Sequence, residues 1–216
     1  ILAGRILGPE EYGKYNFIVA FATTALLLMT WGLDVTTLHF VAKKQDKNSI
    51  ELYLSSSFFT ILTFVFIGGT ILFLAADFFT THFSISRGLF FVCIIFTVIL
   101  TFKNLADSYL RGLGLFREQG IYKIIEAFVS MSIFLFSTSY FLAQKSLDYR
   151  HFLFSLTIGT VITILLIFIR LRSFFRFRFF SMKVMREMFH YGAFILLGGI
   201  ASALLLNSDK ILINKF

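Results

Sequence analysis

Charged residues are scarce in this sequence, and cysteine is almost absent. Only 15% of the 216 residues are Asp, Glu, Lys or Arg, whereas 57% are hydrophobic, and the mean hydropathy is +0.83. A soluble domain of this length could not bury so much apolar surface, so lipid must cover much of the molecule. Cys93 is the single cysteine, which excludes a disulfide framework and a cysteine-based metal cluster.

Several stretches of the sequence are uncharged and long enough to cross a lipid bilayer. A bilayer core of about 30 Å needs roughly 20 apolar residues per helix. Five stretches contain no Asp, Glu, Lys, Arg or His: 15–33, 52–76, 127–144, 152–169 and 191–208. A sixth, 88–102, is apolar but is followed by Lys103 and Asp107. Backbone groups in lipid must be satisfied within their own segment, so these spans are helices.

We therefore predict an all-α integral membrane protein. Its spans are expected near 15–40, 52–76, 88–110, 121–144 and 151–170, with the tail of another helix before them and a further helix from 190. The chain starts in an apolar segment without an initiator Met, so we expect it to be part of a longer protein.

Basic residues in the loops predict the orientation. Counted on alternate sides of successive spans, twelve Lys and Arg residues lie on one side and seven on the other, and the richer side is predicted to be cytoplasmic. This places Lys43, Arg117 and Arg176 inside the cell and Lys14, Thr80 and Lys145 outside. The basic residues are spread over short loops rather than one soluble face, so we expect membrane lipids as partners and no nucleic acid.

Three charged residues recur at spacing four after residue 88. Lys103, Asp107 and Arg111 fall on a helical stripe of roughly 80°. A charge at mid-bilayer costs on the order of 2.5 to 3.5 kcal/mol, so the stripe should face an internal cavity. There Asp107 could pair with either base and leave the other free for an anionic substrate. The alternative is an Asp107–Arg111 pair at the helix end, with Lys103 reaching toward the interface.

Two acidic residues lie near the predicted cytoplasmic ends of their spans. Asp34 and Glu126 are candidates for coupling transport to an ion, or simply for polar helix ends within reach of water. The sequence leaves both roles open.

Several motifs resemble one known family. Residues 5–15, Arg-Ile-Leu-Gly-Pro-Glu-Glu-Tyr-Gly-Lys-Tyr, are similar to the loop after the first helix in polysaccharide transporters of the multidrug/oligosaccharidyl-lipid/polysaccharide exporter superfamily. These are the O-antigen and exopolysaccharide repeat-unit flippases. Residues 32–34, 111–117 and 207–213 agree with the same pattern in order along the chain. His39 and Leu115 depart from it, since basic residues are expected there, so the resemblance assigns them no phosphate contact.

The resemblance implies a transporter of twelve to fourteen helices in two six-helix lobes. Residues 1–189 would form the first lobe, with its first helix mostly missing, and 190–216 the truncated first helix of the second lobe. A weak likeness of residues 1–6 to 211–216 agrees with this division. Within the motifs, Arg5 and Lys210 become further candidates to line the cavity, and Asp209 a further candidate for ion coupling.

The implied function is to flip an undecaprenyl-diphosphate-linked oligosaccharide across the cell's inner (plasma) membrane for lipopolysaccharide or exopolysaccharide synthesis. Other membrane proteins of polysaccharide assembly would be its partners. No catalytic residue, cofactor or metal is expected. Multidrug efflux on the same architecture is the alternative. A membrane glycosyltransferase or polysaccharide polymerase is disfavoured, because such an enzyme would need acidic residues and long loops on the outer side.

Overall fold

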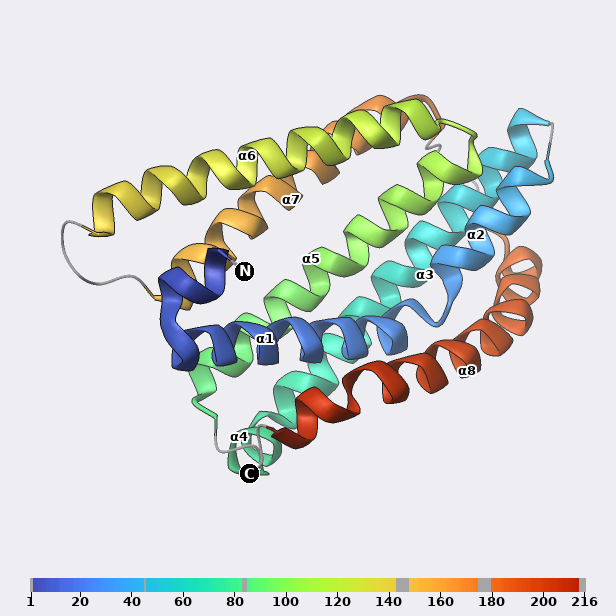
Figure 1. Cartoon of the computed structure of the whole chain (residues 1–216). Coiled ribbons are helices and arrows are strands. Elements are labelled where there is room, and N and C mark those ends of the chain that lie inside the picture. Colours follow the sequence, from blue (N-terminus) through green and yellow to red (C-terminus); the bar gives the residue numbers. More distant parts are fainter. Residues whose placement is uncertain (1, 45, 83–84, 143–147, 175–179, 214–216) are drawn as a thin grey trace.

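The computed structural model is a bundle of helices (Figure 1). It describes residues 2–44, 46–82, 85–142, 148–174 and 180–213, with side chains at 8–44, 46–82, 85–137, 148–174 and 180–202. In chain order the helices are α1 (Leu2–Thr30), α2 (Leu33–Ala42), α3 (Lys47–Leu74), α4 (Ala76–His82), α5 (Arg87–Gly112), α6 (Phe116–Leu142), α7 (Tyr149–Leu171) and α8 (Met182–Ile213), with a 3-10 turn at Arg172–Phe174. The predicted all-α class is confirmed.

Short polar residues begin three of the long helices. Asp46 accepts a hydrogen bond from the Ser49 backbone N–H at 3.0 Å and starts α3. Ser86 does the same for α5 through the N–H of Leu89. Asp148 starts α7 with a reciprocal capping box. Each cap satisfies an N–H that the first helical turn leaves without a partner.

The span predicted at 15–40 is two helices rather than one. The chain turns at Trp31 and Gly32, whose φ angles of 50° and 69° lie in the left-handed region. A β-carbon on Gly32 would lie 2.7 Å from the Gly192 carbonyl oxygen, and one on Gly192 would lie 2.7 Å from the Trp31 carbonyl oxygen. The turn therefore brings α8 into backbone contact with the junction of α1 and α2, and both glycines are needed for that approach.

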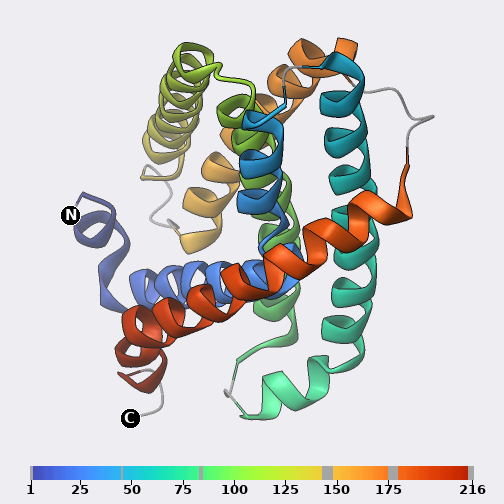
Figure 2. The ribbon, with the colours of Figure 1, turned by 90° about the vertical axis from the view of Figure 1, so that its right-hand side faces the viewer.

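Helix α5 occupies the middle of the bundle and contacts α1, α2, α3, α4, α6 and α7. Two apolar clusters hold it there. One is centred on Tyr109, whose hydroxyl bonds Ser57 and the Leu54 carbonyl. The other surrounds Ile18 and Cys93. Helices α6 and α7 pack along each other, and α8 crosses α1 and α2 (Figures 1 and 2).

Five helices in the described part are long and apolar enough to cross a membrane: Gly8–Thr30, Lys47–Leu74, Arg87–Gly112, Phe116–Ser137 and Tyr149–Phe174. The charged stretch after residue 102 is thus part of a full span. The last predicted span in the chain, 191–208, belongs to α8, which begins at Met182, and its last side chains lie outside the described residues. The division into two lobes stays a prediction.

The loops group at two ends as the alternating count requires. The α2–α3 connection lies near the end of α7, where the Lys47 ammonium stands 6.0 Å from the Phe174 ring centroid. Arg170 of α7 pairs with Glu118 at the start of α6 at this same end. At the opposite end, the Tyr149 N–H donates to Glu11. Arg176 and Lys145 lie outside the described residues.

Candidate functional site

The last turns of α5 carry the predicted charged stripe. Gly114 ends the helix with φ 73°. The Leu115 N–H donates to the Leu110 carbonyl at 2.8 Å, and the Gly114 N–H to the Arg111 carbonyl at 3.1 Å. This pair of bonds is the Schellman termination, which favours glycine at the left-handed position. It directs the chain back into α6, so that α6 runs antiparallel to the stripe.

Lys103 pairs with Glu126 of α6 and not with Asp107, the partner that the sequence suggested. Its Nζ lies 2.5 Å from Glu126 Oε1, and the two side chains are 23% and 14% exposed. The same carboxylate oxygen accepts a hydrogen bond from the Thr160 hydroxyl of α7 at 2.9 Å. A charge-assisted network therefore connects three helices where little water reaches it.

Asp107 lies among several charges. The charged neighbours of its carboxyl group are Lys103 and Arg111 on the same helix and Lys123 and Glu126 of α6. The position is only partly exposed. Asp107 thus lies in the same cluster as Lys103, but the close ion pair of Lys103 is with Glu126.

Arg111 contacts its own helix and faces α2. Its Nη2 donates to Ser108 Oγ at 3.2 Å, and its Nε lies 3.4 Å from the Asp107 backbone carbonyl oxygen. Arg111 is also a charged neighbour of the Asp34 carboxyl group on α2. Arg111 thus contacts the backbone of Asp107 and does not form the side-chain ion pair of the alternative prediction.

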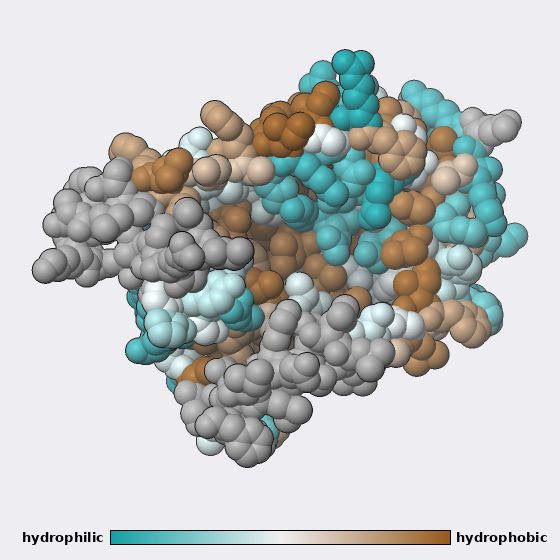
Figure 3. Space-filling model, viewed as in Figure 1, coloured by the Kyte–Doolittle hydropathy of each residue, from teal (hydrophilic) through white to brown (hydrophobic). Residues whose placement is uncertain are grey.

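An apolar groove continues from this cluster between α6 and α7. Its volume is about 510 Å³, and its lining includes Lys123 and Glu126 at one end and Phe134, Phe152 and Leu156 further along. Figure 3 shows hydrophilic atoms gathered beside a hollow with apolar walls on this face. The site thus combines opposite charges with a neighbouring apolar surface.

Close packing fixes the floor of the groove. A β-carbon on Gly159 of α7 would lie 2.0 Å from Ser130 Oγ and 3.0 Å from the Glu126 carbonyl oxygen of α6. Glycine lets the two helices approach, and this approach brings Thr160 within reach of Glu126. Helix contact and polar network therefore depend on each other.

A family model described as polysaccharide biosynthesis protein matches residues 1–216. The chain belongs to the polysaccharide biosynthesis protein family. It is a multi-pass membrane protein of that family, as the resemblance predicted. No curated protein and no solved structure matches it.

In this family member, five predicted residues lie in one region of the bundle. The stripe candidates Lys103, Asp107 and Arg111 share a cluster with Asp34 and Glu126, which were selected separately for ion coupling. The side chains of Arg5, Asp209 and Lys210 lie outside the described residues. Within the described side chains, no group of three His, Cys, Asp or Glu residues could hold a metal.

Sequence reasoning missed Lys123, Thr160 and Ser130. Lys123 precedes Glu126 by three residues, so the two share a helix face, and that spacing was a usable signal. Thr160 lies in an otherwise apolar span between Thr157 and Thr163, a spacing of three that also marks one face. Only the packing of α6 on α7 shows which of these hydroxyls meets Glu126.

Proposed function

We propose that this protein is a flippase for lipid-linked oligosaccharides, acting in the synthesis of a surface polysaccharide. Membership of the polysaccharide biosynthesis family supports the pathway. The observation that carries the proposal is the charged cluster of α5 and α6 beside the apolar α6–α7 groove. A polar anionic headgroup attached to a long hydrocarbon presents those two chemistries together.

The physical task explains why charges line the interior of a membrane protein. Moving a sugar headgroup through hydrocarbon strips its hydrogen bonds to water, at several kcal/mol for each unsatisfied group. A hydrated cavity between two lobes removes that cost, and alternating access moves the cavity from one side to the other. The lipid chain stays in the bilayer. This work needs no covalent chemistry, so the protein is proposed to act as a transporter without catalytic residues or a cofactor.

The cluster contains three basic and three acidic side chains before substrate binds. Lys103, Arg111 and Lys123 oppose Asp34, Asp107 and Glu126. A diphosphate would therefore bind by exchange: phosphate oxygens replace the Glu126 carboxylate at Lys103, or approach Arg111 in place of Asp34. Each exchange leaves a carboxylate without its cation, so that a coupling ion is needed to neutralise it.

This exchange gives Glu126 and Asp34 a role in coupling. When phosphate leaves, each carboxylate returns to its base and the coupling ion is released. Replacement of either acid by its amide should weaken the proton dependence of transport. An unchanged proton dependence in both Glu126→Gln and Asp34→Asn would restrict the two acids to structural roles.

The setting follows from the pathway. We place the protein in the inner (plasma) membrane, with the headgroup taken from the cytoplasmic leaflet and delivered to the outer one. Polysaccharide-assembly proteins in the same membrane are its proposed partners. We propose that the transported sugar is a repeat unit of an O-antigen or of an exopolysaccharide.

Complementation of a flippase-deficient host tests the function. The complete gene product should restore surface polysaccharide, and a Lys103→Gln version should restore much less at equal protein level. Drug resistance is measured in the same cells. If resistance rises and polysaccharide does not return, multidrug efflux is the function instead.

A further inference from the structure

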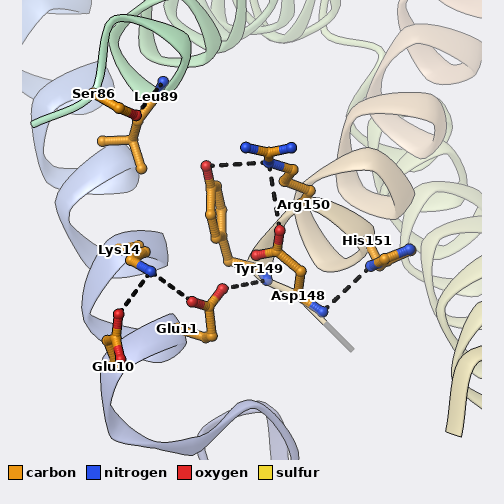
Figure 4. Close-up of polar contacts among 9 residues, drawn as sticks. All are labelled: Glu10, Glu11, Lys14, Ser86, Leu89, Asp148, Tyr149, Arg150 and His151. Atoms are coloured by element: carbon orange, nitrogen blue, oxygen red, sulfur yellow. Dashed lines mark hydrogen bonds and ion pairs between the residues drawn. The ribbon is translucent and has the colours of Figure 1, made fainter. Parts of the chain in front are cut away.

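The ends of α1 and α7 meet far from the charged cluster, at the end of the bundle predicted to face outward. The Tyr149 backbone N–H at the start of α7 donates to Glu11 Oε2 of α1 at 3.1 Å. Next to it, the rings of Tyr15 and Phe152 meet edge to face with centroids 4.8 Å apart. Polar contacts, which Figure 4 shows, and this aromatic contact thus join the two helix ends.

Glu11 is held as a carboxylate by neighbours on both helices. Its other oxygen, Oε1, accepts a hydrogen bond from Lys14 Nζ at 2.7 Å. Lys14 also binds Glu10 at 2.9 Å, but the Glu10 side chain is 83% exposed. Glu10 and Glu11 therefore share a cation, while Glu11 is the one bonded to α7.

Asp148 brings a second carboxyl group to the same contact. Its Oδ2 lies 3.4 Å from Arg150 Nε, whereas its Oδ1 is buried and lacks a hydrogen-bond partner. The carboxyl groups of Asp148 and Glu11 lie beside each other and interact (Figure 4). A buried acceptor beside another carboxylate is unfavourable unless a proton lies between them.

We propose that Glu11 and Asp148 share one proton, and that this proton latches the ends of α1 and α7 together. With the proton present, Asp148 donates an O–H to the Glu11 carboxylate and its buried oxygen gains a partner. Without it, two carboxylates face each other in a partly buried contact and repel. The latch therefore closes in acid and loosens as protons leave.

The surrounding charges agree with this assignment. Glu10 and Lys14 face the contact from α1, and Arg150 and His151 from α7, where His151 Nδ1 accepts the Asp148 N–H at 3.4 Å. At the nearby start of α5, Arg87 pairs with Asp77 of α4, so their charges offset each other.

The direction of the pH dependence follows from Asp148. Burial raises the pKa of the Asp148 carboxyl above the ordinary value of 3.8, and the hydrogen bond and charge of Glu11 raise this pKa further. A raised pKa means that the closed contact binds the proton more tightly than the open one. The proton stabilises the closed contact fully below pH 3.8, and this stabilisation is lost as the pH rises through the raised pKa of Asp148.

Distance measurement between spin labels tests the latch in the complete protein. Labels are placed at Gly13→Cys, where a β-carbon meets nothing within 4 Å, and at Phe154→Cys, which is 61% exposed, in a Cys93→Ala background. The separation should be short in acid and should lengthen as the pH rises above the ordinary aspartate range. This readout is independent of any transport activity, so it can fail or succeed separately from the proposed flippase function.

Amide variants distinguish a shared proton from general effects of pH. Asp148→Asn keeps a residue that caps helices well and donates a permanent N–H, so the labels should stay close at every pH. Glu11→Gln should also remove the pH response. Glu10→Gln is the matched control, since it lies on the same helix and binds the same lysine, and it should respond like the parent. A response that persists in Asp148→Asn, or a separation that never changes with pH, overturns the proposal.

Discussion

Lys103 Nζ lies 2.5 Å from Glu126 Oε1 across the α5–α6 contact, and the Thr160 hydroxyl of α7 donates a hydrogen bond to the same Oε1. One carboxylate thus holds three helices together at the edge of the proposed substrate cavity. Any anion that competes for Lys103 also perturbs this packing. Binding and helix arrangement are therefore linked at one ion pair.

Mutation of this pair should separate its two roles. Lys103→Gln leaves a mostly buried Glu126 carboxylate without its cation and should lower the unfolding free energy by about 1 to 3 kcal/mol. The double variant Lys103→Gln/Glu126→Gln removes the orphaned charge, so the thermal stability of the detergent-solubilised protein should largely return.

Polysaccharide export should not return with stability. If Lys103 contacts the diphosphate, export in the double variant stays roughly tenfold below the parent, which corresponds to about 1.4 kcal/mol of lost binding. Lys103→Arg keeps the charge and should export more than Lys103→Gln. Recovery of export together with stability in the double variant would show that Lys103 is structural.

Gly159→Ala tests the close approach of α6 and α7. The added methyl group would meet Ser130 Oγ and the Glu126 carbonyl, so the helices must separate, at a cost of typically 1 to 3 kcal/mol. The Thr160 bond to Glu126 should weaken with it. Gly120→Ala on α6 meets nothing within 4 Å and is the matched control, expected to be neutral or slightly stabilising. Equal melting temperatures for both variants would refute the close packing.

Gly192→Ala tests the crossing of α8 over the helix break. Its methyl group would lie 2.7 Å from the Trp31 carbonyl oxygen, a backbone atom that cannot move without shifting the turn. We expect loss of stability and increased access of a water-soluble quencher to Trp31, the single tryptophan, read by its fluorescence. Gly198→Ala on the same helix has open space around it and should behave like the parent.

Single-cysteine labelling tests the orientation. In a Cys93→Ser background, an impermeant thiol reagent added to intact cells should label Thr80→Cys and spare Lys43→Cys and Arg117→Cys. Opening the cells should make the last two reactive. Strong labelling of Arg117→Cys from outside would reverse the topology and place the charged cluster near the outer face.

The sequence by itself determined the class of the protein, because hydropathy is a property of composition, and apolar stretches of this length satisfy their backbone groups in lipid as helices rather than as strands. It also located the helices near 52–76, 88–110, 121–144 and 151–170, and the stripe of Lys103, Asp107 and Arg111, since spacing along one helix fixes a shared face. The motifs it carries pointed to the family that the family model confirms.

Only the tertiary structure decided which charges are partners. Periodicity relates residues within a helix, and Lys103 and Asp107 are neighbours in that sense, yet Lys103 pairs with Glu126 because the Gly114 turn brings α6 back along α5. The helix break at Trp31 and Gly32 was hidden for a similar reason: both residues are compatible with an apolar span, and the contact with Gly192 that requires the turn joins residues 160 positions apart. Contacts between distant segments depend on how the helices pack, and local sequence patterns do not encode that packing.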